Sequence, residues 1–339
     1  MISRNIYVDA SNMHSGGGRT LLNGFISGIN DLDNFTIFID KRYRPVIFKK
    51  NIKYIIIHNL FSRLLVAFKI KSKISKHDIV IFLGNLPPII NFNIDKCYLF
   101  LGNRFYVDNE IESFFLPVPI KIKIKIEKIF FHYFIKNVNK VYVQNLTMKN
   151  LCENSIRNKI IEIAAFDDFN DVNFNKIKKE KNSFIYVASN IPYKNHKKLL
   201  YAFSLVNNFT KDYKLYLTID IALKKNLHLK NYVDQHNLKV EFLTFSTRRK
   251  FLDKFKTVET LIYPSMFESY GLPLIEAKKY DLKILSSDLD FTWDLVDPDD
   301  YFNPYDEKSI SRCILRSLNI NNQKTKVYNP KDFVELLLN

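Results

Sequence analysis

Short apolar runs with the composition of β-strands alternate with segments of helical spacing along almost the whole chain of 339 residues. Such alternation is typical of parallel sheets, in which a helix crosses over the sheet between successive strands. The first half predicts strands at Asn5–Ala10, Phe35–Ile39, Ile52–His58, Ile79–Leu83, Cys97–Leu101 and Lys140–Gln144. The second half predicts them at Ser183–Ala188, Lys214–Thr218, Val240–Phe242, Thr260–Tyr263 and Lys283–Ser286.

The polar, charged stretch Asp167–Asn182 lies between these two sets of strands and is the best candidate for a linker. We therefore expect an α/β protein of two doubly wound, Rossmann-like domains, residues 1–167 and 183–322. A C-terminal helix is expected within residues 323–339, where it could pack back on the first domain.

Positive charge is concentrated in the first half. Residues 1–166 hold 24 Lys and Arg against 12 Asp and Glu, a net +12 out of the chain's +16. Such an excess indicates an anionic partner, and no nucleic-acid-binding motif is present, so we expect an anionic membrane surface and no nucleic acid. The N-terminus lacks the apolar core of a signal peptide, and three widely spaced cysteines suggest neither disulfides nor a zinc site. These features predict a cytoplasmic protein, peripheral at the inner face of the cytoplasmic membrane.

The segment Leu261–Lys278, LIYPSMFESYGLPLIEAK, predicts a strand, a loop and a helix. Gly271 breaks the chain and Pro273 suits the start of a helix. The backbone amides of Gly271 and Leu272 would then be available to a phosphate, assisted by the helix dipole. Two carboxylates flank this site, Glu268 in the loop and Glu276 in the helix, and carboxylates bind sugar hydroxyls well.

This pattern, P-S-x-x-E-x-x-G-L-P-x-x-E-A, resembles the signature of the family 4 glycosyltransferases, retaining enzymes of the GT-B fold, in which two Rossmann-like domains face each other across a cleft. The resemblance implies that Glu268 lies against the donor sugar, that the amides of Gly271 and Leu272 hold the donor diphosphate, and that Glu276 binds the ribose. Ser269 and Tyr270 of the same loop are also predicted to bind the donor. It further implies an acceptor-binding first domain and a second domain that binds a nucleotide sugar.

Three loops of the first half follow predicted strands, where ligands of open α/β sheets bind. Gly16, Gly17 and Gly18 precede a helix and resemble the family's loop beside the diphosphate, so Gly17 and Gly18 are predicted to contact the donor. Two Gly-Asn pairs follow other strands, and they place Asn85, Asn103 and the adjacent Arg104 as candidate acceptor or sugar ligands. The alternative is that both pairs only form turns.

A fourth loop, after Ser183–Ala188, carries Lys194 and Asn195 immediately before a predicted helix. Lysine in this position can neutralise a diphosphate, and the arrangement resembles the family's phosphate-binding loop. The family's arginine is replaced by Ser189, so another cation such as Arg104 or Arg19 would have to compensate. Glu268 and Lys194 are thus the predicted catalytic residues, with Ser189 and Asn195 among the donor-binding ones.

The segment Pro119–Lys136 alternates like a strand at its start but also has an apolar stripe of helical spacing, and its length favours a helix. A basic helix with exposed aromatic residues can lie on an anionic bilayer. The alternative is an ordinary helix with solvated lysines.

Together these features predict a retaining glycosyltransferase that moves a sugar from a nucleotide diphosphate to a saccharide acceptor, linked to a lipid, as in bacterial O-antigen or capsule synthesis. No metal and no cofactor beyond the nucleotide sugar are expected. The resemblance implies a front-face mechanism, in which the leaving phosphate accepts the proton of the acceptor. A GT-B epimerase or phosphorylase would use the same cleft, and the loss of arginine at Ser189 would fit an inactive relative that binds a sugar nucleotide or a membrane.

Overall fold

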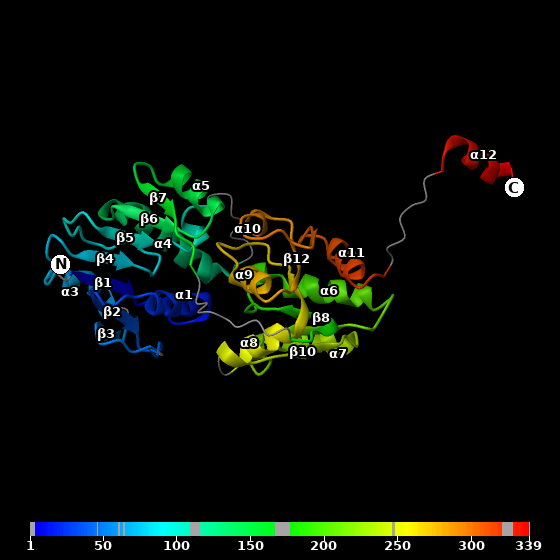
Figure 1. Cartoon of the computed structure of the whole chain (residues 1–339), viewed down its shortest axis with the longest axis horizontal. Helices are drawn as coiled ribbons and strands as arrows, with labels where there is room; N and C mark the ends of the chain where they lie inside the picture. Colours follow the sequence, from blue (N-terminus) through cyan, green and yellow to red (C-terminus); the bar gives the residue numbers. More distant parts are fainter. Residues whose placement is uncertain are drawn as a thin grey trace.

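The computed structural model describes residues 4–45, 47–59, 62–63, 65–108, 116–166, 177–245, 248–320 and 328–338. Within these residues the chain forms two parallel β-sheets, one from each half of the sequence, with helices on both faces (Figure 1). The alternation of strands and helices therefore predicted the architecture correctly.

The first sheet has the strand order β3-β2-β1-β4-β5-β6-β7. Its strands are β1 (Asn5–Ala10), β2 (Asn34–Asp40), β3 (Ile52–Ile57), β4 (Ile79–Phe82), β5 (Cys97–Phe100), β6 (Lys140–Val143) and β7 (Ile160–Ile163). Its helices are α1 (Gly16–Ser27), α3 (Val66–Lys71), α4 (Val118–Phe134) and α5 (Leu146–Ser155), with single 3-10 turns η1 (Arg104–Tyr106) and η3 (Ile135–Asn137).

The second sheet has the order β10-β9-β8-β11-β12-β13. Its strands are β8 (Glu180–Tyr186), β9 (Lys214–Leu217), β10 (Val240–Phe242), β11 (Val258–Tyr263), β12 (Lys283–Ser287) and β13 (Asp300–Phe302). The associated helices are α6 (His196–Val206), α7 (Leu227–Gln235), α8 (Arg248–Thr257), α9 (Leu272–Lys279), α10 (Asp290–Trp293) and α11 (Glu307–Ser317), with 3-10 turns η4 (Pro192–Lys194) and η5 (Lys224–Asn226). A last helix, α12 (Pro330–Leu338), follows.

In both sheets the strand order reverses beside the first strand. This happens between β1 and β4 in the first sheet and between β8 and β11 in the second. Loops leaving two such neighbouring strands run to opposite faces of the sheet and open a crevice at the carboxyl ends. The fold therefore directs attention to the loops after β1, β4, β8 and β11.

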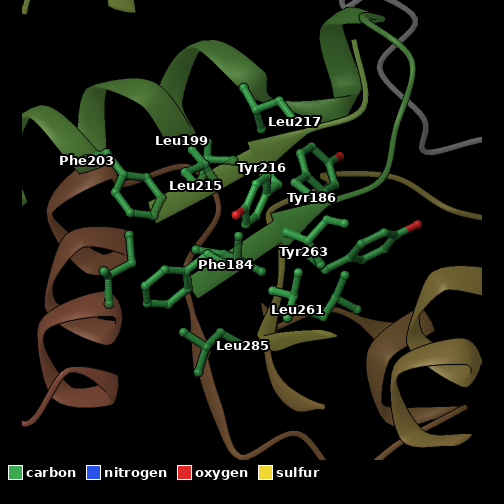
Figure 2. Packing of buried hydrophobic residues seen from close by; sticks show 14 of the residues in the cluster. Phe184, Tyr186, Leu199, Phe203, Leu215, Tyr216, Leu217, Leu261, Tyr263 and Leu285 are labelled. Carbon is green, nitrogen blue, oxygen red and sulfur yellow. The ribbon is translucent and has the colours of Figure 1, made fainter. Parts of the chain in front are cut away.

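Each sheet has its own buried core. In the second domain, side chains of the strands, including Phe184, Tyr186, Tyr216 and Tyr263, form one cluster with buried residues of α6, such as Phe203, and of α11 (Figure 2). The first sheet buries separate apolar clusters. The cysteines Cys97, Cys152 and Cys313 are free and buried.

Four expectations need correction or qualification. Strand β8 begins at Glu180, inside the expected linker Asp167–Asn182, because Glu180 already pairs with Val258 of the neighbouring strand β11. Residues 167–176 of that linker lie outside the described residues.

Strand β7 was not predicted: only one of its four residues is buried, so its sequence lacks a clear apolar pattern. The glycines Gly16, Gly17 and Gly18 do not precede α1 but form its first turn, closed by a bond from the amide of Arg19 to the carbonyl of Ser15.

The expected C-terminal helix is present as α12, while residues 323–327 and 339 lie outside the described residues. Helix α12 lies apart from both sheets, and none of its residues is buried (Figure 1). The packing of this helix on the first domain is therefore not found in this structure. No described helix is both long and apolar enough to span a membrane.

Candidate functional site

Lys194 and Glu268 meet beyond the carboxyl ends of two neighbouring strands. Lys194 ends η4 in the connection after β8, and Glu268 lies in the loop between β11 and α9. The Lys194 ammonium donates a hydrogen bond to Oε1 of Glu268, and the two side chains are only 15% and 11% exposed. Because β8 and β11 are paired and parallel, their following loops start at the same edge of the sheet, and this brings together two residues that lie 74 positions apart.

The two loops are tied together by main-chain and side-chain hydrogen bonds. The amide of Met266 donates to the carbonyl of Tyr193 over 2.8 Å. The buried side-chain amide of Asn195 donates to the carbonyls of Pro264, at 3.1 Å, and Pro304, at 2.8 Å. Asn195 also takes a left-handed conformation with φ 62°, which asparagine tolerates better than most residues. Its side chain therefore holds the loops that carry Lys194 and Glu268.

Gly271 directs the chain from the Glu268 loop into α9. Its φ of 93° lies in the left-handed region, where residues with a Cβ are strained. It is the residue before the first turn of α9, where the first amides of a helix lack carbonyl partners from a preceding turn and can bind an anion. The side chain of Leu272 packs against Gly17 of the first domain. A Cβ atom at Gly17 would lie only 3.3 Å from Cδ1 of Leu272. The N-terminal turns of α1 and α9 thus meet across the two sheets.

A pocket of about 400 Å³ lies beside the Lys194–Glu268 pair, with walls from both domains. Its lining residues are Asn85, Gly102, Asn103, Arg104, Phe105, Ile120, Lys123, Ile124, Glu127, Tyr193, Phe267, Glu268 and Ser269. Three aromatic rings form one side: Phe105 of the first domain packs against Phe267 and Tyr193 of the second, with centroids 4.6 and 6.0 Å apart. Ring faces of this kind can pack on the apolar face of a sugar.

The expected acceptor ligands line this pocket, but most of their polar atoms are already bonded. Oδ1 of Asn85 accepts from the amide of Gly102 at 2.6 Å, and Oδ1 of Asn103 accepts from the amide of Phe105 at 3.1 Å. Asn85 is also left-handed, with φ 69°. Asn103 thus makes a local turn, as the alternative interpretation predicts, whereas Asn85 ties the loop after β4 to the loop after β5.

Arg104 makes ion pairs with carboxylates of both domains. Its guanidinium bonds Asp108 of its own domain at 2.8 Å and Asp290 of the other at 2.6 Å, and it donates to the carbonyl of Glu268 at 3.3 Å. The neighbouring carboxylates raise its pKa against the opposing effect of burial, so Arg104 stays charged. The guanidinium is therefore already occupied at the position where a phosphate contact was considered.

The other predicted residues occupy the same region. Ser189 is exposed in the connection between β8 and η4. The carbonyl of Ser269 accepts from the side chain of Asn145 at 3.1 Å, and Tyr270 is buried. Glu276 lies in α9 and is only 2% exposed. Gly18 abuts the backbone of Met13 in the first turn of α1.

Two buried tyrosines at the site were missed by the sequence analysis. The hydroxyl of Tyr263 donates to Oε1 of Glu268 at 2.6 Å, and that of Tyr186 donates to the carbonyl of Lys194 at 2.7 Å. The signal was a tyrosine as the last residue of each central strand, where its hydroxyl can reach beyond the sheet edge. Burial, followed by the charge of Glu268, raises the pKa of both hydroxyls well above 10.

Helix α4 confirms the helical interpretation of Pro119–Lys136 and presents two faces. Ile120, Ile124 and Glu127 line the pocket. The other face carries an exposed apolar stripe made of Val118, Ile122, Ile126, Ile129 and Tyr133. Lys121 and Lys125 follow one side of this stripe, whereas Lys128 donates to the carbonyl of Asp108 at 2.9 Å.

Among the described residues, no group of three or more His, Cys, Asp or Glu side chains is placed to hold a metal ion.

Comparison with known proteins agrees with this geometry. Residues 167–330 match the family model "Glycosyl transferases group 1". The chain is 27% identical over 233 residues to the O-antigen chain mannosyltransferase RfbU of Salmonella typhimurium, an alignment that covers 63% of this chain and 60% of that protein. The chain therefore spans less than two thirds of the length of this relative.

Two solved structures share the fold over nearly the whole chain. The lipopolysaccharide outer core galactosyltransferase WaaB in its apo form has a TM-score of 0.60 and 14% identity, covering 94% of this chain and 92% of that one. The Anabaena protein HepE, in complex with UDP and glucose, has a TM-score of 0.63 and 10% identity, covering 93% and 90%. Residues 167–330, which include Lys194 and Glu268, are thus similar to the glycosyl transferases group 1 family, and the chain has the GT-B fold of these two structures.

Proposed function

We propose that this protein is a glycosyltransferase that moves a sugar from a nucleotide-diphosphate donor to a saccharide acceptor in the synthesis of a cell-surface polysaccharide. The observation that carries the proposal is the Lys194–Glu268 pair, held at the carboxyl ends of β8 and β11 beside the first turn of α9. A cation, a carboxylate and free helix amides in one crevice suit a sugar joined to a diphosphate. The mannosyltransferase and galactosyltransferase relatives support transfer of a hexose or a related sugar.

On this proposal the donor diphosphate lies at the amides of Gly271 and Leu272. Lys194 neutralises the charge that develops on the leaving phosphate, because fixed donors aimed at a developing charge stabilise the transition state most. Glu276 binds the ribose, and Gly17 lets the donor approach the first turn of α1. The complex of HepE with UDP and glucose supports a nucleoside diphosphate as the donor part, without identifying the base or sugar used here.

The proposed reaction retains the anomeric configuration. The bond from the anomeric carbon to the phosphate oxygen breaks, the acceptor oxygen bonds to that carbon from the same face, and its proton passes to the leaving phosphate oxygen. Oε1 of Glu268 is occupied by Lys194 and Tyr263, an arrangement that suits a carboxylate held in place beside the sugar better than a nucleophile. The positive groups of the site would stabilise the diphosphate, so we propose that neither a metal nor another cofactor is required.

We propose the interdomain pocket as the acceptor site. It opens beside Glu268 and combines polar residues with the rings of Phe105, Tyr193 and Phe267, a combination suited to saccharides. The outer stripe of α4 would rest on the anionic inner face of the cytoplasmic membrane, while the inner face of the same helix lines the pocket. That arrangement would present the pocket to a lipid-linked acceptor.

The test is a thermal-shift screen of UDP- and GDP-sugars, followed by assays of nucleotide release. A donor at a hundred times its Kd should stabilise the protein by about 2.7 kcal/mol. With that donor, free UDP or GDP should appear only when a saccharide acceptor is added, with or without EDTA, and NMR of the product should show the donor's anomeric configuration. Binding without turnover for every acceptor would favour a non-catalytic relative, and the absence of any stabilisation would overturn the proposal.

A further inference from the structure

Two buried tyrosines stand directly beneath the proposed catalytic pair. Tyr186 is the last residue of β8 and Tyr263 the last residue of β11, the neighbouring strands at which the strand order of the second sheet reverses. Both side chains are at most 1% exposed, and their rings pack edge to face with centroids 5.7 Å apart. Figure 2 shows both hydroxyl groups pointing to the same side of the cluster.

The Tyr263 hydroxyl bonds the side chain of Glu268, and the Tyr186 hydroxyl bonds the backbone of Lys194. Tyr263 donates to Oε1 of Glu268 at 2.6 Å, so this oxygen receives two protein donors, the tyrosine and the Lys194 ammonium. Among the residues that the structure describes, Oε2 of Glu268 has no hydrogen-bond partner, and Glu268 lines the pocket. Tyr186 donates to the carbonyl of Lys194 at 2.7 Å, immediately before the left-handed Asn195.

We infer that Tyr263 and Tyr186 are positioning residues of the transfer reaction: Tyr263 holds the Glu268 carboxylate in the orientation that leaves Oε2 for the donor sugar, and Tyr186 holds the turn that presents Lys194. This inference rests on the proposed function and extends it by two residues that do not touch the substrate. A charged side chain held in place by buried hydrogen-bond donors does not have to reorient in the transition state. Positioning residues of this kind therefore increase the rate of the reaction.

Neither tyrosine is suited to act as a base. Burial, with the charge of Glu268 as the next cause, keeps the pKa of each hydroxyl well above 10. Both therefore remain donors throughout the pH range in which an enzyme of this kind works.

The same core contains a matched control. Tyr216 on β9 is also 1% exposed and belongs to the same cluster, but its hydroxyl donates to Oε2 of Glu180 at 2.6 Å, at the start of β8. In Figure 2 its hydroxyl points away from those of Tyr186 and Tyr263. Tyr216→Phe therefore removes one buried hydroxyl bonded to a carboxylate, at the opposite end of the strands from the pocket.

The experiment compares Tyr263→Phe, Tyr186→Phe and Tyr216→Phe in the full chain. Each variant keeps its ring, so unfolding temperatures of the three should lie close together. With the donor found in the screen, Tyr263→Phe should lower kcat by about 10–100-fold, the effect of losing one hydrogen bond to a charged group, with a smaller change in KM. Tyr186→Phe, which loses a hydrogen bond to the neutral carbonyl of Lys194, should lower kcat by about 3–10-fold. Tyr216→Phe should leave kcat within about twofold of the wild type.

A double-mutant cycle separates positioning from a general structural effect. If Tyr263 acts through Glu268, then adding Tyr263→Phe to Glu268→Gln should reduce the residual kcat by less than about twofold. An additive loss, an equal loss in Tyr216→Phe, or a wild-type kcat in Tyr263→Phe would overturn the inference while leaving the proposed function intact. Failure of the wild-type protein to turn over any donor would instead overturn the proposed function, and this inference with it.

Discussion

Arg104 and Asp290, which belong to different domains, are joined by two hydrogen-bonded contacts of 2.6 and 2.9 Å. The same guanidinium also bonds Asp108 and the carbonyl of Glu268. Arg104 lies in η1, directly after β5, whereas Asp290 begins α10. One side chain of the first domain thus contacts the loop that carries Glu268 and fixes the two domains relative to each other around the pocket.

Asp290→Asn should loosen this contact between the domains. The substitution removes the negative charge that pairs with Arg104. Because the Asp290 carboxylate is 38% exposed, solvent screening limits the loss to about 1 kcal/mol. This corresponds to about a fivefold rise in the population of molecules whose two domains have separated. Small-angle scattering should show a larger radius of gyration. The control is Asp288→Asn, which makes the same change in charge at a carboxylate bonded to Trp293 of its own domain. Equal scattering from both variants would argue against a link between the domains.

Lys194→Ala should lower kcat by about 10–100-fold and raise KM for the donor by less. The reason is that negative charge builds up on the diphosphate as the glycosidic bond breaks, so the lysine contributes more to the transition state than to the bound donor. Steady-state kinetics measure both values. Lys198→Ala is the matched control. Lys198 forms a 2.9 Å ion pair with Glu307, and neither residue lines the pocket. A change confined to KM would make Lys194 a ground-state contact.

Glu276→Gln should weaken binding of the nucleoside diphosphate by about 1–1.5 kcal/mol, because a hydrogen bond from the ribose to a carboxylate becomes a weaker one to a neutral amide. Isothermal titration calorimetry with UDP and GDP tests this. Glu307→Gln on α11, a surface residue paired with Lys198, provides a control for the loss of one carboxylate. An unchanged affinity in a folded Glu276→Gln protein would contradict the assignment to the ribose.

The sequence predicted the strands better than the contacts between them. Alternating apolar runs predicted every central strand of both sheets, because those strands are buried on two faces. Strand β7 was not predicted because three of its four residues are exposed, so its sequence lacks the apolar run of a buried strand. The glycines of α1 were placed before the helix, although they form its first turn against Met13 and Leu272.

The position of the candidate site followed from local motifs, but the partners within it did not. Glu268 and Lys194 were each predicted from loops at strand ends, and the topology of the sheet explains why they meet. Arg104 was expected to have a phosphate as its partner, and its ion pair with Asp290 spans 186 positions of sequence. Pairings over such separations depend on how two domains dock, which local spacing does not encode.

His196 should make the protein less stable as the pH falls below about 6.5. Its ring is 2% exposed, and burial, assisted by the charge of Lys194, lowers its pKa to about 3 in the folded chain. In the unfolded chain the pKa is about 6.5. Between these values the unfolded chain binds the additional proton, so stability is lost as the pH decreases.

From pH 7 to pH 5 this group should account for about 2 kcal/mol of lost stability. Urea unfolding at the two pH values should show the wild type losing that much more than His196→Phe. His77→Phe, at an exposed histidine, should lose as much as the wild type. Parallel pH profiles for the wild type and His196→Phe would contradict this prediction.

The exposed stripe of α4 should mediate binding to anionic vesicles. Ile126 and Ile129 are 62% and 72% exposed at the centre of the stripe, and burying each in a bilayer surface should contribute about 1.5–3 kcal/mol. Ile126→Ser with Ile129→Ser should therefore reduce binding to phosphatidylglycerol vesicles at least about tenfold in a sedimentation assay. Leu32→Ser, at a residue 77% exposed elsewhere in the first domain, should bind as the wild type does.

Charge should contribute separately to the same binding. Lys121 and Lys125 flank the stripe, and each lysine near an anionic surface is worth about 1 kcal/mol, so Lys121→Glu with Lys125→Glu should weaken binding further. Raising the salt from 0.1 M to 1 M shortens the Debye length from about 10 Å to about 3 Å and should weaken binding of the wild type more than that of this variant. Turnover of a soluble acceptor analogue should stay unchanged in both double variants, since their side chains lie outside the pocket. If both variants bound vesicles normally, α4 would be an ordinary solvated helix, and the acceptor would reach the pocket without the membrane.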